Sequence, residues 1–233
     1  CARDLFLSSP EAHPVFHSVF GWLTCFLDLS TTAATGRAIG WLLLAVGWVR
    51  LSHRYVAGRA MAVLTAAVAV VLCDRAHMAG EWIVGGFEAK VPAFAFLLFA
   101  LAEVVHDRWR SATVLAGIAT AFHPLVGGWG LIALAWAWIC EPTPSSLIDR
   151  FRVLLPALVV AAAMALLGVM PALQLEQGVD RLTHLGARRI YVYWRIGHHL
   201  LLQQMAWHLV ARHLLLILAW LVAWRLAPRS AGR

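Results

Sequence analysis

The feature that most constrains this chain is a series of seven apolar segments separated by short charged ones. The apolar segments span residues 37–51, 60–73, 91–105, 111–123, 126–140, 153–171 and 209–226. A helix crosses a bilayer with about 20 mostly apolar residues, and with fewer where the membrane is locally thin. The pattern therefore predicts an all-α fold, a polytopic membrane helical bundle of about seven transmembrane helices, which we interpret as one domain over residues 1–233.

The composition agrees with a membrane protein. Hydrophobic residues make up 61% of the 233 residues and charged residues 13%, whereas a soluble domain has about 45–50% apolar and about 25% charged residues. More than half of a folded protein's surface faces its solvent, so the solvent here is mostly lipid. A soluble enzyme, a disordered tail, a collagen-like chain and a disulfide scaffold are excluded. The net charge of +7 does not indicate nucleic-acid binding, because the basic residues are scattered through short loops.

Basic residues predict the orientation, because short cytoplasmic loops are enriched in arginine and lysine. With the 50–60 loop inside, the short inside connections and the end of the chain carry ten arginines: Arg50, Arg54, Arg59, Arg108, Arg110, Arg150, Arg152, Arg225, Arg229 and Arg233. The outside segments carry seven basic residues in longer connections. We therefore expect residues 1–36, 74–90 and 172–204, and the turn at 123–128, on the extracytoplasmic side of the cell membrane.

Two local patterns predict helix boundaries near the outer side. Apolar residues from Val15 to Leu27 recur at helical spacing, which predicts a short amphipathic helix lying in the membrane interface. Pro124 lacks a backbone donor and disfavours helix at His123, so we expect a break between segments 111–123 and 126–140. One long kinked helix is the alternative.

Titratable side chains collect in the predicted outer segments. Asp4 and Glu11 precede the amphipathic helix, and Glu88 and Lys90 lie at the mouth of segment 91–105, where charge is costly unless it is paired or used. Lys90 is the only lysine in the sequence, and its ammonium suits a phosphate or carboxylate partner. The alternative is a local ion pair of Lys90 with Glu88 or Glu81.

A histidine stands at the predicted outer break, and a denser cluster follows further along the chain. His123 precedes the Gly127-Gly128 turn, where a ligand can approach the backbone closely. Between residues 188 and 199 the sequence places five basic or titratable side chains among aromatic ones: Arg188, Arg189, Arg195, His198 and His199. Arginine forks suit phosphate oxygens, and histidines bind phosphate or shuttle protons. Residues 190–193 alternate in polarity, which predicts an extended piece.

No metal or cofactor motif accompanies these residues. The four cysteines show no CxxC pair. His13 and His17 are four residues apart, but Pro14 lies between them and no HExxH sequence follows. We expect no cofactor, and a divalent metal stays open.

Taken together, the runs GGFEAK, AFHPLVGGW and YVYWRIGHHL, after an acidic segment and an interfacial helix, resemble a bacterial branch of the GT-C superfamily of integral-membrane glycosyltransferases. The resemblance covers roughly residues 1–226 and implies a bacterial inner-membrane enzyme. It also implies a helix before the first outer loop, so we expect this chain to be a piece of a longer protein.

The resemblance assigns roles to the candidate residues. In GT-C enzymes the first outer loop supplies an acidic base or metal ligand, and later outer loops hold the lipid phosphate of the donor. It implies Asp4 or Glu11 as the base, and we add Glu88 as a third catalytic candidate. The residues implied to hold phosphate or acceptor are Lys90, His123, Arg188, Arg195, His198 and His199. Asp4 and Glu11 are seven residues apart, which departs from the paired-acid motif common in GT-C first loops.

Three functional hypotheses follow. The first is an extracytoplasmic-facing glycosyltransferase-like enzyme whose partners are the lipid bilayer and a polyprenyl-phosphate sugar donor, with no nucleic acid. The second is a transporter or lipid-handling protein without bond-making chemistry, although no inverted repeat is evident. The third is a structural membrane subunit that packs through small residues such as Gly36 and Gly40.

Overall fold

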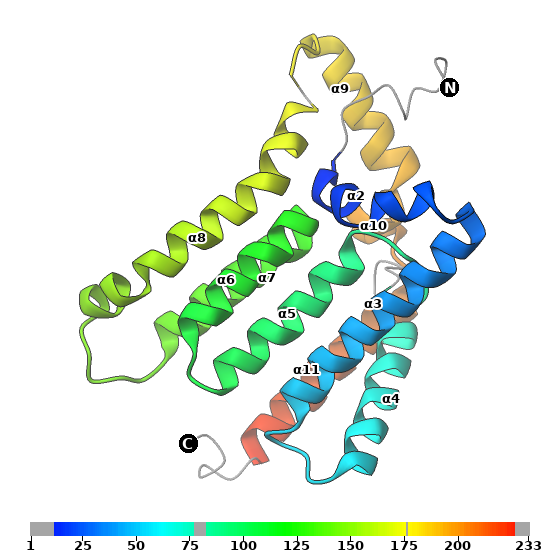
Figure 1. Cartoon of the computed structure of the whole chain (residues 1–233). Coiled ribbons are helices and arrows are strands. Elements are labelled where there is room, and N and C mark those ends of the chain that lie inside the picture. Colours follow the sequence, from blue (N-terminus) through cyan, green and yellow to red (C-terminus); the bar gives the residue numbers. More distant parts are fainter. Residues whose placement is uncertain (1–11, 77–82, 176, 227–233) are drawn as a thin grey trace. The chain divides into compact units, whose positions relative to one another are not determined.

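The computed structural model describes residues 12–76, 83–175 and 177–226, and within these ranges the chain is helical, with no strand. The all-α prediction is confirmed for this part of the chain (Figure 1). The described residues group into two compact units. Unit 1 comprises those within Cys1–Ala66 and Ile83–Gln177, and unit 2 those within Ala67–Trp82 and Gly178–Arg233. Each unit is described by itself.

Unit 1 contains most of the helices. They are α2 (Pro14–Phe20), η1 (Gly21–Cys25), α3 (Leu29–Ser52), the first part of α4 (Arg59–Ala76), α5 (Lys90–Val105), α6 (Trp109–Phe122), α7 (Pro124–Cys140) and α8 (Leu147–Gln174). Unit 2 contains the end of α4 followed by α9 (Arg181–Arg189), η2 (Ile190–Arg195), α10 (Gly197–Leu200), η3 (Leu202–Gln204) and α11 (Trp207–Leu226). Each of the seven predicted apolar segments coincides with one of these helices.

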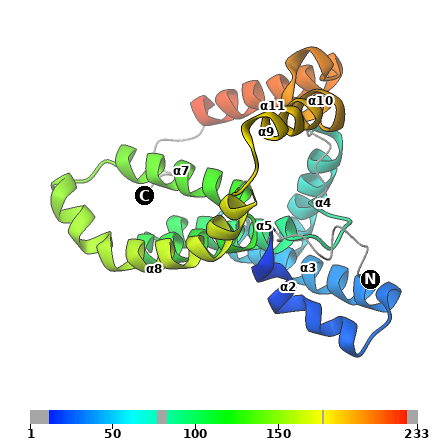
Figure 2. The same ribbon diagram turned by 90° about the horizontal axis from the view of Figure 1, so that it is seen from above.

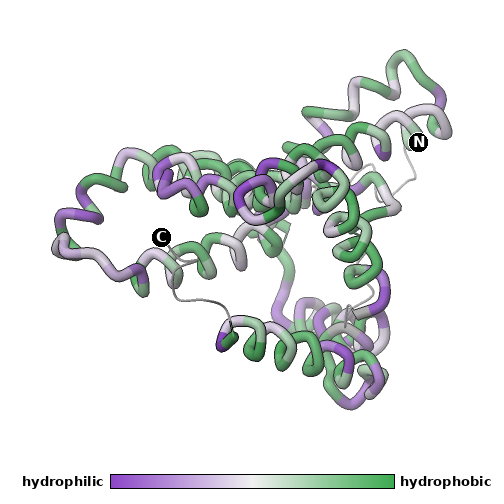
Figure 3. Tube along the Cα trace, turned by 90° about the horizontal axis from the view of Figure 1, so that it is seen from below, coloured by the Kyte–Doolittle hydropathy of each residue, from purple (hydrophilic) through white to green (hydrophobic). Residues whose placement is uncertain are grey.

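Three helices are long and apolar enough to cross a membrane, namely α3, α8 and α11. Their apolar side chains are largely exposed: Leu42, Val160 and Leu218, for example, all face outward. Figure 3 shows the hydrophobic colour along most helical turns and the hydrophilic colour mainly at turns and helix ends. This distribution fits a chain whose surroundings are lipid, and it confirms the coarse prediction of a membrane protein.

Helix α3 begins at Leu29, eight residues before the predicted apolar segment, because Asp28 caps it. The Asp28 carboxylate accepts hydrogen bonds from the Thr31 hydroxyl at 2.7 Å and the Thr31 amide at 3.0 Å. These hydrogen bonds hold the pKa of Asp28 below its usual value. The cap satisfies amides at the first turn of the helix. Residues 29–36, placed in the outer loop from the sequence, are therefore helical.

Helix α6 is the centre of unit 1 and packs against α5, α7 and α8 (Figures 1 and 2). Its buried positions are almost all small: Ala112, Thr113, Ala116, Gly117, Ala119, Thr120 and Ala121. A Cβ on Gly117 would lie 2.6 Å from the Ala161 backbone, and one on Gly168 would lie 2.5 Å from the carbonyl oxygen of Ala121. The two helices α6 and α8 therefore touch backbone to backbone, as small residues permit in membranes.

The predicted break between α6 and α7 is confirmed, and the continuous kinked helix is wrong. The turn predicted at residues 123–128 is also wrong beyond His123, because Gly127 and Gly128 lie in the first turns of α7. Helix α6 ends at Phe122 and α7 begins at Pro124, with His123 extended between them at φ −146° and ψ 102°. Proline disfavours helical backbone at the preceding residue and suits the first position of the next helix.

A buried carboxylate joins α3 and α5 to the turn before α6. Glu103 is buried with 6% of its side chain exposed. Arg50 donates to its Oε1 through Nε at 3.1 Å and through Nη2, and Arg108 lies 3.6 Å from its Oε2. The two guanidinium groups compensate a charge that would otherwise be costly to bury.

We predict that Glu103→Gln lowers the free energy of unfolding by about 1–2 kcal/mol, because the charge-assisted hydrogen bonds from Arg50 to this buried side chain are lost while both arginines stay partly exposed to solvent. The matched control is Asp74→Asn, which removes a carboxylate from the exposed Arg75–Asp74 pair and should cost less than about 1 kcal/mol. Denaturation of the protein in mixed detergent micelles measures both. Equal losses in the two variants would contradict the prediction.

The turn between α5 and α6 contains a strained residue. Asp107 has φ +59°, which no other non-glycine residue shows in the described ranges. Its amide donates to the Val104 carbonyl at 2.9 Å, and the Arg108 amide donates to the Glu103 carbonyl at 2.9 Å. This is the hydrogen-bond pattern of a Schellman helix end, whose left-handed position favours glycine.

We predict that Asp107→Gly raises the free energy of unfolding by about 1 kcal/mol, because glycine has no Cβ to strain at positive φ. Thermal unfolding in detergent measures the shift. Asp107→Ala serves as the control, since it removes the carboxylate but keeps the Cβ. If both variants are stabilised equally, the effect comes from loss of the carboxylate charge, and the prediction is contradicted.

In unit 2 the extended piece predicted for residues 190–193 is wrong. Residues Ile190–Arg195 form the π-helix η2, which continues directly from α9. The Ile196 amide donates to the Tyr191 carbonyl five residues earlier at 2.9 Å. Helix α9 begins at a strong cap, because Asp180 accepts from the amides of Leu182 and Thr183, both at 3.0 Å. A four-residue alternation is too short to overrule a helix that is already nucleated.

Candidate functional site

A cavity of about 320 Å³ lies in unit 1 where α5 begins and α6 ends. Its lining comes from three segments that are distant in sequence: His13, Phe16 and His17 near α2, Phe87 to Lys90 before and at the start of α5, and His123 between α6 and α7. Figure 2 views this end of the unit. The structure therefore brings three sequence-predicted residues, Glu88, Lys90 and His123, to one place.

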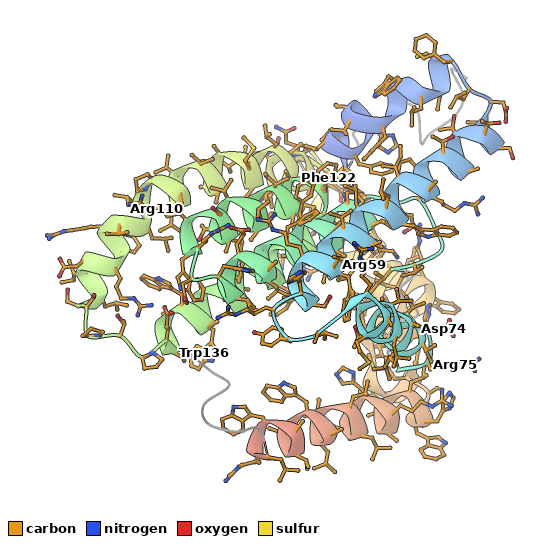
Figure 4. All side chains as sticks on the ribbon, turned by 60° about the horizontal axis from the view of Figure 1, so that its bottom comes forward. Arg59, Asp74, Arg75, Arg110, Phe122 and Trp136 are labelled. Carbon is orange, nitrogen blue, oxygen red and sulfur yellow. The ribbon has the colours of Figure 1, made fainter. Side chains whose placement is uncertain are left out.

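Aromatic side chains support this cavity. The rings of Phe16 and Phe20 on α2 lie 4.9 and 5.0 Å from the ring of Phe87, and Phe20 also lies 6.3 Å from Phe122. Phe122 is buried and closes the last turn of α6, at the opposite end of the helix from Arg110 (Figure 4). The aromatic cluster holds α2 and the segment before α5 against the end of α6.

Lys90 is the cation of the cavity, and it is paired with Glu88. Its Nζ lies 3.1 Å from Oε2 of Glu88, with 13% of the lysine side chain exposed and 54% of the glutamate side chain. The local pair that the sequence left open as an alternative is therefore present. The lysine side chain is therefore largely buried, whereas the side chain of Glu88 is about half exposed. Both side chains line the cavity, so an anion that enters it would meet the ammonium together with its carboxylate partner.

His123 has two contacts that fix its ring. Its Nδ1 accepts a hydrogen bond from the Val126 amide at 3.3 Å, which caps α7. Its ring stacks on that of His13, with 4.8 Å between centroids and 22° between planes. Because the capping bond requires an unprotonated Nδ1, the neutral ring carries its proton on Nε2.

Most of the residues that line this cavity were not predicted from the sequence. His13 and His17 share the cavity because α2 begins at Pro14, with His13 as its N-cap and His17 one turn later. Their spacing of four residues was the available signal, but it was considered only for zinc. Within the described ranges no group of three or more His, Cys, Asp or Glu side chains is arranged to hold a metal ion.

A glycine on α3 makes room for the segment that carries Glu88 and Lys90. A Cβ on Gly36 would lie 2.1–2.4 Å from atoms of the Phe87 ring. Only a residue without a side chain lets the ring sit there, so Gly36 fixes the position of the aromatic support.

We predict that Gly36→Ala lowers the free energy of unfolding by about 1–3 kcal/mol, because the added methyl group forces the Phe87 ring to move. The matched control is Gly128→Ala on α7, where no atom lies within 4 Å of the added Cβ. Thermal unfolding of both variants measures the difference. The prediction is contradicted if the two substitutions have the same effect.

The other basic candidates belong to unit 2. Arg188 and Arg189 occupy the last turn of α9 and are exposed. The Arg195 guanidinium lies 5.9 Å from the centre of the Tyr191 ring. Arg189, Tyr193 and Trp194 line a second cavity of about 640 Å³.

The remaining basic candidates, His198 and His199, follow on α10. His198 is exposed on α10, and His199 follows it on the same helix, with its side chain outside the description. At the start of α9, the Thr183 hydroxyl and amide hold the pKa of Asp180 below its usual value. Asp4 and Glu11, implied as the base by the resemblance, lie outside the described residues.

Comparison with known proteins adds no relative to this picture. No protein-family model, no curated protein and no solved structure matches the chain.

Proposed function

We propose that this protein is an extracytoplasmic-facing membrane glycosyltransferase-like enzyme that uses a polyprenyl-phosphate-linked sugar. The cavity of unit 1 would receive the phosphate of the donor. The observation that carries the proposal is the largely buried side chain of Lys90, which lines a cavity together with the carboxylate of Glu88 and three histidines. The GT-C resemblance supports the same class of reaction.

The proposal includes a topology in which the seven apolar helices cross the membrane. Helices α3 to α8 then alternate in direction, which places the start of α5 and the end of α6 on the same side. That side is the extracytoplasmic one by the arginine distribution. The polyprenyl phosphate of a lipid-linked sugar lies at that membrane surface, as the cavity would require.

In the proposed reaction an acceptor hydroxyl attacks the anomeric carbon of the sugar. The new carbon–oxygen bond forms as the bond from that carbon to the phosphate oxygen breaks. The electron pair leaves with the phosphate, whose negative charge the Lys90 ammonium stabilises, and the hydroxyl proton passes to a carboxylate. We assign this role to Glu88, because its side chain lines the same cavity as Lys90.

The Glu88–Lys90 pair couples the two roles. A phosphate that binds Lys90 competes with Glu88 for the three N–H groups of the same ammonium. The donor therefore releases the carboxylate at the moment when a base is needed. Glu88→Gln removes both the competing carboxylate and the base. This variant should therefore bind the donor but not transfer the sugar.

We predict that Lys90→Gln reduces binding of a short-chain polyprenyl-phosphate sugar in nanodiscs about tenfold or more, because a charge-assisted contact to phosphate is lost. The matched control is Arg37→Gln, which removes an exposed cation from the outer half of α3 and should bind normally. Glu88→Gln should bind at least as tightly as the wild type while surface glycan transfer is lost.

Three outcomes contradict the proposal. Binding that is unchanged in Lys90→Gln removes the phosphate role of the cavity. Full transfer by Glu88→Gln removes the base. Directional uptake of a lipid into liposomes without sugar transfer favours the transporter or lipid-handling hypothesis.

A further inference from the structure

Unit 1 contains another cavity, of about 530 Å³, at the opposite end of α6 from the Lys90 cavity. It is formed where the α5–α6 turn and the first turn of α6 meet the end of α7 and the start of α8. The part of its lining that matters here comprises Arg108, Trp109, Arg110, Ser111, Trp138 and Val153. None of the sequence-predicted site residues belongs to it, and it does not depend on the function proposed above.

The wall of this cavity is braced by a nearly buried arginine. Arg150 on α8 has 12% of its side chain exposed. It donates to the Trp138 carbonyl at 2.5 Å and to the Glu141 carboxylate at 2.9 Å, and its guanidinium lies 4.5 Å from the Trp138 ring centre. These contacts join the end of α7 to α8, and they pair the Glu141 carboxylate with a cation.

Hydrogen-bond donors at the start of α6 exceed the acceptors available to them. The first hydrogen bond of the helix runs from the Ala112 amide to the Arg108 carbonyl at 3.0 Å, and no side chain among the described residues caps the earlier amides. The Nε1–H of Trp109 is buried and has no acceptor within the described part of the chain. A helix start of this kind, flanked by arginines, attracts an anion.

Arg110 supplies the charge for such an anion. Its Nε donates to the Val153 carbonyl at 2.8 Å, which holds the guanidinium at the cavity wall. It makes no other hydrogen bond or ion pair with the described residues, so the two Nη groups of its fork remain for a ligand. A planar fork with paired N–H groups matches two oxygens of a phosphate.

Two of the three carboxylates in the lining are already engaged by other groups. Glu141 is paired with Arg150, and Asp149 accepts from the Ser146 hydroxyl at 2.6 Å and lies 3.5 Å from Arg152. Asp107 lines the cavity from the preceding turn and is exposed, as Arg110 is. Trp138, Val153 and Leu154 supply apolar surface, and Ser111 and Ser145 add polar groups.

We propose that this cavity binds a phosphate-bearing group, with the anionic headgroup of a membrane phospholipid as the occupant. The Arg110 fork and the first amides of α6 would bind the phosphate, and the apolar wall would face the glycerol and upper acyl region. In the membrane topology proposed above, this end of unit 1 lies on the cytoplasmic side, where anionic lipids are abundant. A soluble phosphate ester shares the same chemistry and is the other source to test.

The test is lipid retention by the full chain in nanodiscs. Discs containing phosphatidylglycerol in phosphatidylcholine are compared with discs of phosphatidylcholine alone, and bound lipid is counted by native mass spectrometry. We expect the wild type to retain phosphatidylglycerol and Arg110→Gln to retain about tenfold less, because the fork to phosphate is lost. Arg54→Gln, an exposed arginine outside the lining, is the matched control and should behave as the wild type.

A second arm distinguishes the source of the phosphate. Glycerol phosphate is added to protein in phosphatidylcholine discs, and its binding is measured by calorimetry. Binding that Arg110→Gln abolishes, without preferential retention of phosphatidylglycerol, supports the phosphate site and assigns it to a soluble ester. The proposal is overturned if lipid retention and glycerol phosphate binding are the same in the wild type and in Arg110→Gln. It is also overturned if Arg54→Gln loses them to the same extent as Arg110→Gln. Thermal unfolding of Arg110→Gln verifies that the variant is folded.

Discussion

The close approach of α6 to its neighbours is the constraint on which unit 1 depends. In a helix with Ala, Gly and Thr at its buried positions, the side chains contribute little packing energy. The stabilisation comes instead from close backbone contacts, as between Gly117 and Ala161 and between Gly168 and Ala121. Lipid tails are as apolar as the helix surface, so area burial alone would not drive association there. Shape and close backbone contact take its place.

Placing α6 at the centre fixes both ends of the unit. At one end the helix stops at His123, beside the aromatic support of Phe122 and the start of α5 at Lys90. At the other end the Asp107 turn aims Arg108 back at Glu103 and presents Arg110 to α8. Each of the two cavities of unit 1 is thus formed by one terminus of α6 together with the neighbouring helix ends, which explains why polar side chains gather there.

The apolar helices were well predicted, because helices in lipid need long apolar segments and such segments are easily recognised in a sequence. The break at His123 was equally readable, since Pro124 acts on its immediate neighbour. The cavity was only half predictable. Glu88 and Lys90 are charges two residues apart at a helix start, and the sequence shows them together. His13 and His123 stack although they are distant in sequence, and a single sequence does not reveal such a contact. The extended reading of residues 190–193 failed because four alternating residues do not outweigh the helix that precedes them.

Helix length gives the two cavities a common physical setting. Helices α5, α6 and α7 have 16, 14 and 17 residues, which corresponds to about 24, 21 and 26 Å at the helical rise. The hydrocarbon core of a bilayer is about 30 Å thick. If these helices cross as proposed, their charged ends cannot stay submerged in hydrocarbon, so the bilayer thins and headgroups are drawn toward Lys90 on one side and Arg110 on the other. Lipid phosphates would then lie at the depth of both cavities, so that phosphate recognition requires no access from bulk water.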